Sequence, residues 1–216
     1  LNIWLVAFLE MGVLGVALSA MLSSSIFALL LLAYTLRYVG WGFDSVLAKK
    51  MVIFCWPLWL AGFAGLYIGS ANRYYLRIFS SLDDVGLFEL AAKFGVILSV
   101  LIWEPFATYW QVERFKYYQQ GDAEPIFQKV FLFISTLLVL AALGVAIFSG
   151  PIIRFMADSA FHRAAAAVPF LGFASVFSSL VNFDNFSFLV TENTAWISRN
   201  NFITVFFITI FYFALI

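Results

Sequence analysis

The sequence is poor in charge, cysteine and histidine, and each shortage excludes a class of protein or site. Only 11% of the 216 residues are charged, and the formal net charge at neutral pH is zero. Without a basic excess, nothing points to the phosphate backbone of a nucleic acid as a partner. The single cysteine, Cys55, and the single histidine, His162, exclude a disulfide framework and a clustered Cys/His metal site within this stretch.

Catalytic signatures are also missing from the sequence. It contains no G-x-S-x-G motif, no glycine-rich loop of the kind that cradles phosphates, and no H-E-x-x-H motif. We therefore expect no catalytic residues, no enzyme activity and no cofactor.

Apolar residues are what the sequence has in abundance. They make up 64% of the chain, which includes 27 Phe and 7 Trp, and the mean hydropathy is +0.98. A soluble domain is about half apolar and about a quarter charged, so this composition predicts a lipid bilayer as the solvent. The chain begins at Leu1 and ends at Ile216 inside an apolar run, so we expect a piece of a longer membrane protein.

Long apolar runs predict about five full membrane-spanning helices with partial ends, because a span takes about 20 apolar residues. The runs are continuous rather than alternating, which favours helices over barrel strands. The predicted fold class is therefore all-α, a polytopic transmembrane helix bundle. Residues 1–9 are expected to end an earlier helix, and a cut sixth span is expected to start near residue 202. The expected full spans are residues 11–34, 51–76, 85–110, 126–148 and 164–190.

Cations in the connections predict the orientation. The positive-inside rule assigns the cation-rich connections to the cytoplasm. The connections near Asp83, Asp84 and Asp158 are then external, although Arg154 and Arg163 weaken the asymmetry. The cations assigned to the cytoplasmic side are Arg37, Lys49, Lys50, Arg114, Lys116, Lys129 and Arg199.

Two arginines end the second apolar run, one helical turn apart. Arg73 and Arg77 follow Asn72 closely, and a guanidinium suits bidentate binding of phosphate or carboxylate. One interpretation is that both line a water-filled cavity. The alternative is that they snorkel to the interface or pair with Asp83 and Asp84.

The next helix is predicted to carry a charge deep in the membrane. The sequence from Ser81 to Asp84 fits a capping box, which places the helix start near Leu82. Lys93 then lies roughly 16 Å into the helix, where a charge costs at least about 2.5 kcal/mol and usually faces the bundle interior. Glu89, one turn earlier, can pair with Lys93 as a purely structural alternative.

Further polar residues extend this pattern. Pro105 is expected to kink the helix beside Glu104. Asp184 is expected near the cytoplasmic end of its helix, where interfacial placement is the alternative to a cavity. The predicted polar stripe comprises Glu89, Lys93, Glu104, Thr108 and Gln111.

The stretch ANRYYLRIFSSLDDVGLFELAAKFG, residues 71–95, resembles the segment that opens the second half of polysaccharide flippases. The family pattern is Asp/Asn-Arg-Tyr, a short loop, Val-Gly-Leu/Ile-Tyr, then Ala-x-Lys. Asn72 stands here where Asp is commoner, and Phe88 stands where Tyr is usual. The flanking stretches 56–70 and 103–110 are also similar to the family, and the specific signal is confined to residues 56–110.

This resemblance implies the multidrug/oligosaccharidyl-lipid/polysaccharide exporter superfamily, whose members have two similar lobes around a central cavity. Residues 1–36 would end the first lobe, residues 37–50 would be the cytoplasmic link, and residues 51–216 would form most of a truncated second lobe. The implied function is flipping of polyprenyl-pyrophosphate-linked oligosaccharides by alternating access, for polysaccharide or O-antigen synthesis. The implied location is a bacterial or archaeal plasma membrane.

The implied partners are the lipid-linked oligosaccharide, the bilayer and a coupling proton or cation. Three alternatives remain open. The first is a drug/cation antiporter of the same superfamily, which favours a carboxylate-dominated cavity. The others are a membrane oligosaccharide polymerase or ligase, which needs a large polar external loop, and a purely structural subunit. The candidate substrate-binding cations are Arg73, Arg77 and Lys93. The candidate coupling or cavity residues are Glu89, Glu104, Asn72 and Asp184.

Overall fold

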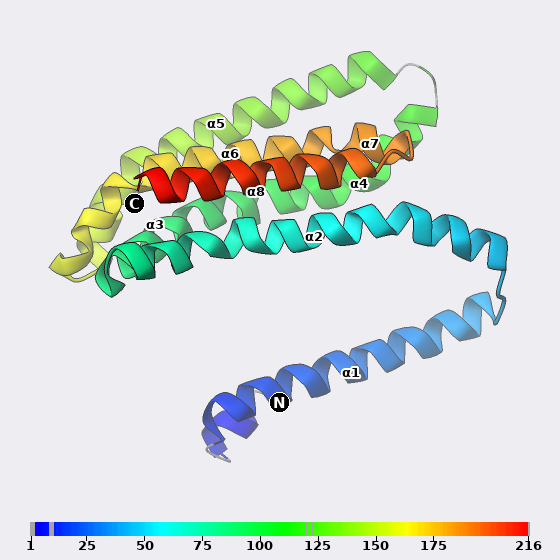
Figure 1. Ribbon diagram of the computed structural model, residues 1–216, viewed down its shortest axis with the longest axis horizontal. Coiled ribbons are helices and arrows are strands. Elements are labelled where there is room, and N and C mark those ends of the chain that lie inside the picture. The colour runs from blue at the N-terminus through cyan, green and yellow to red at the C-terminus, as the bar shows by residue number, and fades with distance from the viewer. Residues whose placement is uncertain (1–2, 9–10, 120, 122, 216) are drawn as a thin grey trace. The chain divides into compact units, whose positions relative to one another are not determined.

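The computed structural model describes residues 3–8, 11–119, 121 and 123–215, and among them there are helices and no strand (Figure 1). Within these described ranges, six helical segments are long and apolar enough to cross a membrane. The chain is therefore a multi-pass, all-α membrane protein, as the apolar runs predict. The segments are Gly12–Val39, Ser45–Phe79, Leu82–Gln119, Ala123–Met156, Val168–Val190 and Ala195–Ala214.

The last segment differs from the prediction. Helix α8 (Ala195–Leu215) begins well before residue 202 and is long enough to span. Its first turns contain Arg199, which the sequence assigns to a cytoplasmic connection, and there Asn201 donates a hydrogen bond to the Ala61 carbonyl (3.1 Å). Just before the helix, the Thr194 hydroxyl donates to the Phe54 carbonyl (2.9 Å). These polar side chains are satisfied by a neighbouring helix backbone, so they do not interrupt the span.

The chain divides into two compact units, Leu1–Met51 and Val52–Ile216. The first holds η1 (Trp4–Phe8), a π-helix, and α1 (Gly12–Val39). Gly40 ends α1 with a positive φ of 79°, and the Asp44 carboxylate accepts from the Val46 amide (2.8 Å) where the next helix starts. The expectation for residues 1–9 falls partly outside the described residues, and the assignment of lobes stays a prediction.

Three helices of the second unit pack most extensively on one another: α3 (Leu82–Leu98), α5 (Ala123–Met156) and α6 (Val168–Asp184) (Figure 1). Helices α3 and α6 approach closely at Gly95, where a Cβ would lie 3.1 Å from the Leu171 carbonyl oxygen. The Ser175 hydroxyl donates to the Gly95 carbonyl (2.9 Å) and bonds Ser99 Oγ (3.0 Å). Small residues and interhelical hydrogen bonds are how helices associate in lipid.

A π-helix, η2 (Ser99–Trp103), joins α3 to α4 (Glu104–Gln119) within one span. The Glu104 amide donates to the Ser99 carbonyl, five residues earlier. This wide turn lies immediately before Pro105, where the sequence predicts a kink. One extra residue rotates the rest of the span by about 100°, so Glu104 does not continue the face of Lys93 as the predicted stripe requires.

Short elements connect the remaining helices. Helix α2 (Ser45–Phe79) leads into α3 through residues 80–81. The 3₁₀-helix η3 (Ser159–Ala166) joins α5 to α6, and α7 (Phe186–Val190) leads from α6 toward α8. Glu192 lies between α7 and α8 with a positive φ of 56°.

Candidate functional site

A charged cluster lies where α2 and α3 meet. The Arg73 guanidinium of α2 binds the Glu89 carboxylate of α3 in bidentate fashion, with Nε donating to Oε1 and Nη2 donating to Oε2 (3.2 Å). The Arg73 side chain is 57% exposed and that of Glu89 is 33% exposed. Glu89, for which pairing with Lys93 is the structural alternative in the sequence, therefore binds Arg73 instead.

Chain reversal explains this pairing. The short turn at residues 80–81 makes α2 and α3 antiparallel, so the last residue of α2 and the first residue of α3 lie at the same end of the bundle. The depth of a residue in either helix is measured along the helix axis from that end. At 1.5 Å per residue, Arg73 lies about 9 Å and Glu89 about 10 Å from that end. Lys93 lies one turn deeper, at about 16 Å, and Arg77 lies about 3 Å from the end.

The turn is stabilised by its own side chains. The Asp84 amide donates to Ser81 Oγ (3.1 Å), which confirms the predicted cap and the start of α3 at Leu82. The Ser80 and Ser81 hydroxyls both donate to Asp84 Oδ2 (2.5 and 2.6 Å). Asp84 is thus occupied by the turn, and no described carboxylate lies within 4 Å of the Arg77 guanidinium.

Lys93 and Glu89 line one cavity of about 300 Å³. Its other wall comes from the connection between α5 and α6, which contributes Asp158 and Phe161. The Lys93 side chain is exposed, and its amine has no carboxylate within 4 Å in the described part of the chain.

Asp158 was not among the predicted site residues. Hydrogen bonds from the Ala160 amide (3.0 Å) and the Ser159 hydroxyl (3.3 Å), with a smaller effect of His162, lower the pKa of this carboxyl below its ordinary value. Asp158 therefore stays ionised in the Lys93 cavity. The sequence Asp158-Ser159-Ala160 at the start of a helix is a recognisable N-cap signal. It does not show which helix forms the other wall of the cavity.

The other predicted residues fall in different places. Asn72 is half-buried beside the cluster, and its Oδ1 accepts from the Arg73 amide (2.7 Å). Glu104 is exposed and does not line the Lys93 cavity. Asp184 is the exposed last residue of α6, at the opposite end of the bundle from the cluster. The structure brings together Arg73, Glu89 and Lys93 from the predicted set.

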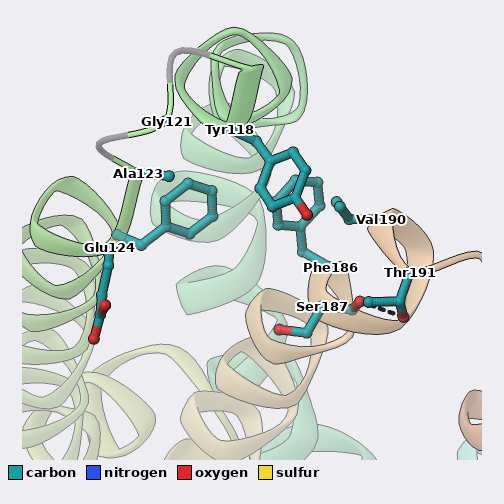
Figure 2. Close-up of a pocket in the computed structure, with 9 residues that line it drawn as sticks. Tyr118, Gly121, Ala123, Glu124, Phe186, Ser187, Val190 and Thr191 are labelled. Carbon is teal, nitrogen blue, oxygen red and sulfur yellow. Dashed lines mark hydrogen bonds between the residues drawn. The ribbon is translucent and has the colours of Figure 1, made fainter.

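A larger hollow of about 580 Å³ lies at that opposite end, between the end of α4, the start of α5 and α7 (Figure 2). Figure 2 shows the rings of Tyr118 and Phe186 beside one another, and their centroids are 6.4 Å apart. The Thr191 hydroxyl donates to the Ser187 carbonyl (2.9 Å) on its α7 wall. None of these residues was predicted from the sequence to belong to a site.

Comparison with protein-family models, with curated proteins and with solved structures finds no match to this chain. Function is therefore inferred from the charged cluster and from the membrane-spanning helices that carry it.

Proposed function

We propose that this protein is a membrane transporter that flips polyprenyl-pyrophosphate-linked oligosaccharides across the plasma membrane. One observation carries the proposal: Arg73 and Lys93 place two cations inside membrane-spanning helices, and only Arg73 has a described carboxylate partner. A charge inside a span is costly and typically marks a substrate or ion pathway.

The geometry of the pair is compatible with a pyrophosphate ligand. Arg73 binds the two oxygens of Glu89 through two nitrogens, and a phosphate presents oxygens to the same guanidinium edge. In the proposed bound state a cargo phosphate replaces Glu89 at Arg73. Lys93, one turn deeper, supplies a second cation for the other phosphate, while the lipid tail stays in the bilayer.

Glu89 is the candidate coupling residue, because the cargo phosphate would displace its carboxylate from Arg73 and leave it able to bind a coupling proton or cation. This exchange would accompany the alternating exposure of the cavity to the two sides of the membrane.

The second candidate is a drug/cation antiporter. It is favoured by the two carboxylates, Glu89 and Asp158, that line the same cavity as the single amine of Lys93. A cationic cargo would compete with Arg73 for Glu89, so this function predicts that Glu89→Gln abolishes export of a cationic dye and that deletion leaves oligosaccharide export intact.

The test deletes the gene in its host and measures lipid-linked oligosaccharide at the cytoplasmic face. Rescue is compared for wild type, Arg73→Ala and Arg154→Ala at matched expression. Arg154 is an exposed cation in the last turn of α5 and serves as the control. We expect accumulation on deletion, full rescue by wild type and Arg154→Ala, and at least tenfold weaker rescue by Arg73→Ala, as for loss of a charged hydrogen bond of about 1.5–3 kcal/mol.

Two results would contradict the proposal at different points. Complete oligosaccharide units at the outer face without the gene would overturn the flippase function and favour the antiporter or a polymerase. Full rescue by Arg73→Ala would leave transport intact and remove the arginine from the cargo site.

A further inference from the structure

A separate cavity of about 460 Å³ lies between α2, α4, the end of α6 and the start of α8. Its walls combine indole and phenyl rings, Trp103 and Phe183 among them, with four polar side chains. None of these residues belongs to the charged cluster of α2 and α3. The polar lining residues are Gln111, Arg114, Asn182 and Asn185.

Arg114 is the one cation of this lining, and aromatic rings hold it in place. Its guanidinium carbon lies 4.4 Å from the ring centroid of Phe186 and 5.5 Å from that of Phe115. Phe186 also lines the hollow of Figure 2, so its ring forms part of the partition between that hollow and Arg114. Cation–π contacts of this kind orient a guanidinium without using its N–H donors.

Those donors lack an anionic partner. The Nε of Arg114 is buried, and it has no hydrogen-bond partner among the described residues. No described carboxylate lies within 4 Å of the guanidinium, and the adjacent acid, Glu113, binds Lys116 instead (2.6 Å). A buried donor left unpaired is costly, so an acceptor beside this guanidinium would stabilise it.

The chemistry of the cavity is compatible with a phosphate group. The guanidinium edge binds two oxygens of a phosphate in its plane while its face stays on Phe186. The exposed amides of Gln111 and Asn182 can hydrogen-bond the hydroxyl or ester oxygens attached to that phosphate.

The position of Arg114 indicates where this phosphate comes from. Arg114 lies about 8 Å from the end of α4, in its polar last turns. Lys116 and Lys129 lie at the same end of the bundle, which the positive-inside rule assigns to the cytoplasm. Basic pockets between spans on that side bind anionic lipid headgroups.

We propose that this cavity binds the phosphate of an anionic glycerophospholipid from the cytoplasmic leaflet, with Arg114 as the phosphate ligand. The site lies at the opposite end of the bundle from Arg73, and the proposal does not depend on the identity of the cargo.

The test measures lipid retention by the full-length protein, purified in detergent, with native mass spectrometry. Phosphatidylglycerol is compared with phosphatidylcholine, and inorganic phosphate is titrated separately. Arg114→Gln removes the charge, while Ala107→Phe fills the cavity and leaves the charge in place. Lys116→Gln is the matched control, because it removes a cation of the same helix from outside the cavity lining.

We expect wild type and Lys116→Gln to retain phosphatidylglycerol, and both cavity variants to bind it at least tenfold more weakly, as for loss of a charged hydrogen bond. If Arg114→Gln fails to fold, Ala107→Phe alone decides. Equal retention by wild type and the cavity variants would overturn the site. Equal retention of phosphatidylcholine, or binding of inorganic phosphate as tight as that of the lipid, would overturn the assignment to an anionic lipid.

Discussion

At the scale of the residue, the Arg73–Glu89 pair joins two spans through a partly exposed contact. A bidentate guanidinium–carboxylate pair has defined geometry, whereas an exposed ion pair is weak because water and salt screen it. The pair therefore favours one alignment of α2 and α3, and it remains weak enough for a ligand phosphate to replace the carboxylate. This balance is what an exchangeable binding group requires.

A double-mutant cycle measures this pair. We expect Arg73→Gln and Glu89→Gln to show a coupling of about 1 kcal/mol in the free energy of unfolding in mixed micelles. Arg77→Gln with Glu89→Gln is the control and should be additive, because the Arg77 guanidinium has no described carboxylate within 4 Å. Additivity of the Arg73 cycle would show that the pair contributes nothing to stability.

Asp158 predicts a dependence of stability on pH. Its folded pKa is lowered, first by the Ala160 amide and then by the Ser159 hydroxyl, so its ionised form stabilises the fold. That contribution is complete above the unfolded pKa of about 3.9 and is lost as the pH falls through the folded pKa. Asp158→Asn keeps an acceptor oxygen and removes the titration.

The measurement is thermal unfolding of wild type and Asp158→Asn between pH of about 6 and 3. We expect the difference in melting temperature between wild type and Asp158→Asn to shrink as the pH falls through this range. Two melting curves that fall in parallel would show that this carboxyl does not contribute to the acid sensitivity.

At the scale of the element, the contact between α3 and α6 depends on the absence of a side chain at Gly95. Gly95→Leu forces atoms against the Leu171 carbonyl and is expected to lower the free energy of unfolding by about 1–3 kcal/mol. Gly144→Ala in α5 is the control, because nothing lies within 4 Å of its added Cβ, and it should be neutral or stabilising. The free energies of unfolding of wild type and both variants are measured by chemical unfolding. If Gly95→Leu is as stable as wild type, α6 shifts to accommodate the leucine.

The π-helix η2 is a second structural element that affects the two cavities. Trp103 of η2 and two residues of α4, Gln111 and Arg114, line one cavity, while Glu89 and Lys93 of α3 line another. A single span thus contributes to two sites at its two ends. π-Helical turns are frequent at functional positions, and this one separates two polar faces of the same span.

At the scale of the whole molecule, orientation can be tested by labelling. In a Cys55→Ser background, we expect Ala160→Cys to react with a membrane-impermeant maleimide on intact cells. Gln119→Cys should react only after permeabilisation, because the positive-inside rule places the end of α4 in the cytoplasm. The reverse labelling pattern would invert the predicted orientation and assign the Arg114 cavity to the outer leaflet.

The sequence by itself determined the class of the molecule and its local signals. Apolar runs of about 20 residues require helices in lipid, because every backbone polar group must then be satisfied within the segment. The start of α3 at Leu82 was also predictable, since the Ser81–Asp84 cap lies within four residues of chain. Both are local properties, which need no knowledge of neighbouring helices.

Only the tertiary structure decided which groups meet. Glu89 has a local candidate partner in Lys93, yet it binds Arg73, because the reversal of the chain after α2 brings that guanidinium to the same depth. The start of α8 was predicted wrongly, because the polar stretch before residue 202 is helical, and Asn201 within it donates to a backbone carbonyl of α2. Asp158 and Arg114 each line a cavity together with residues that are distant in sequence. Contacts between distant elements depend on how the helices pack and on their rotational phase. The spacing of residues along the sequence does not determine either property.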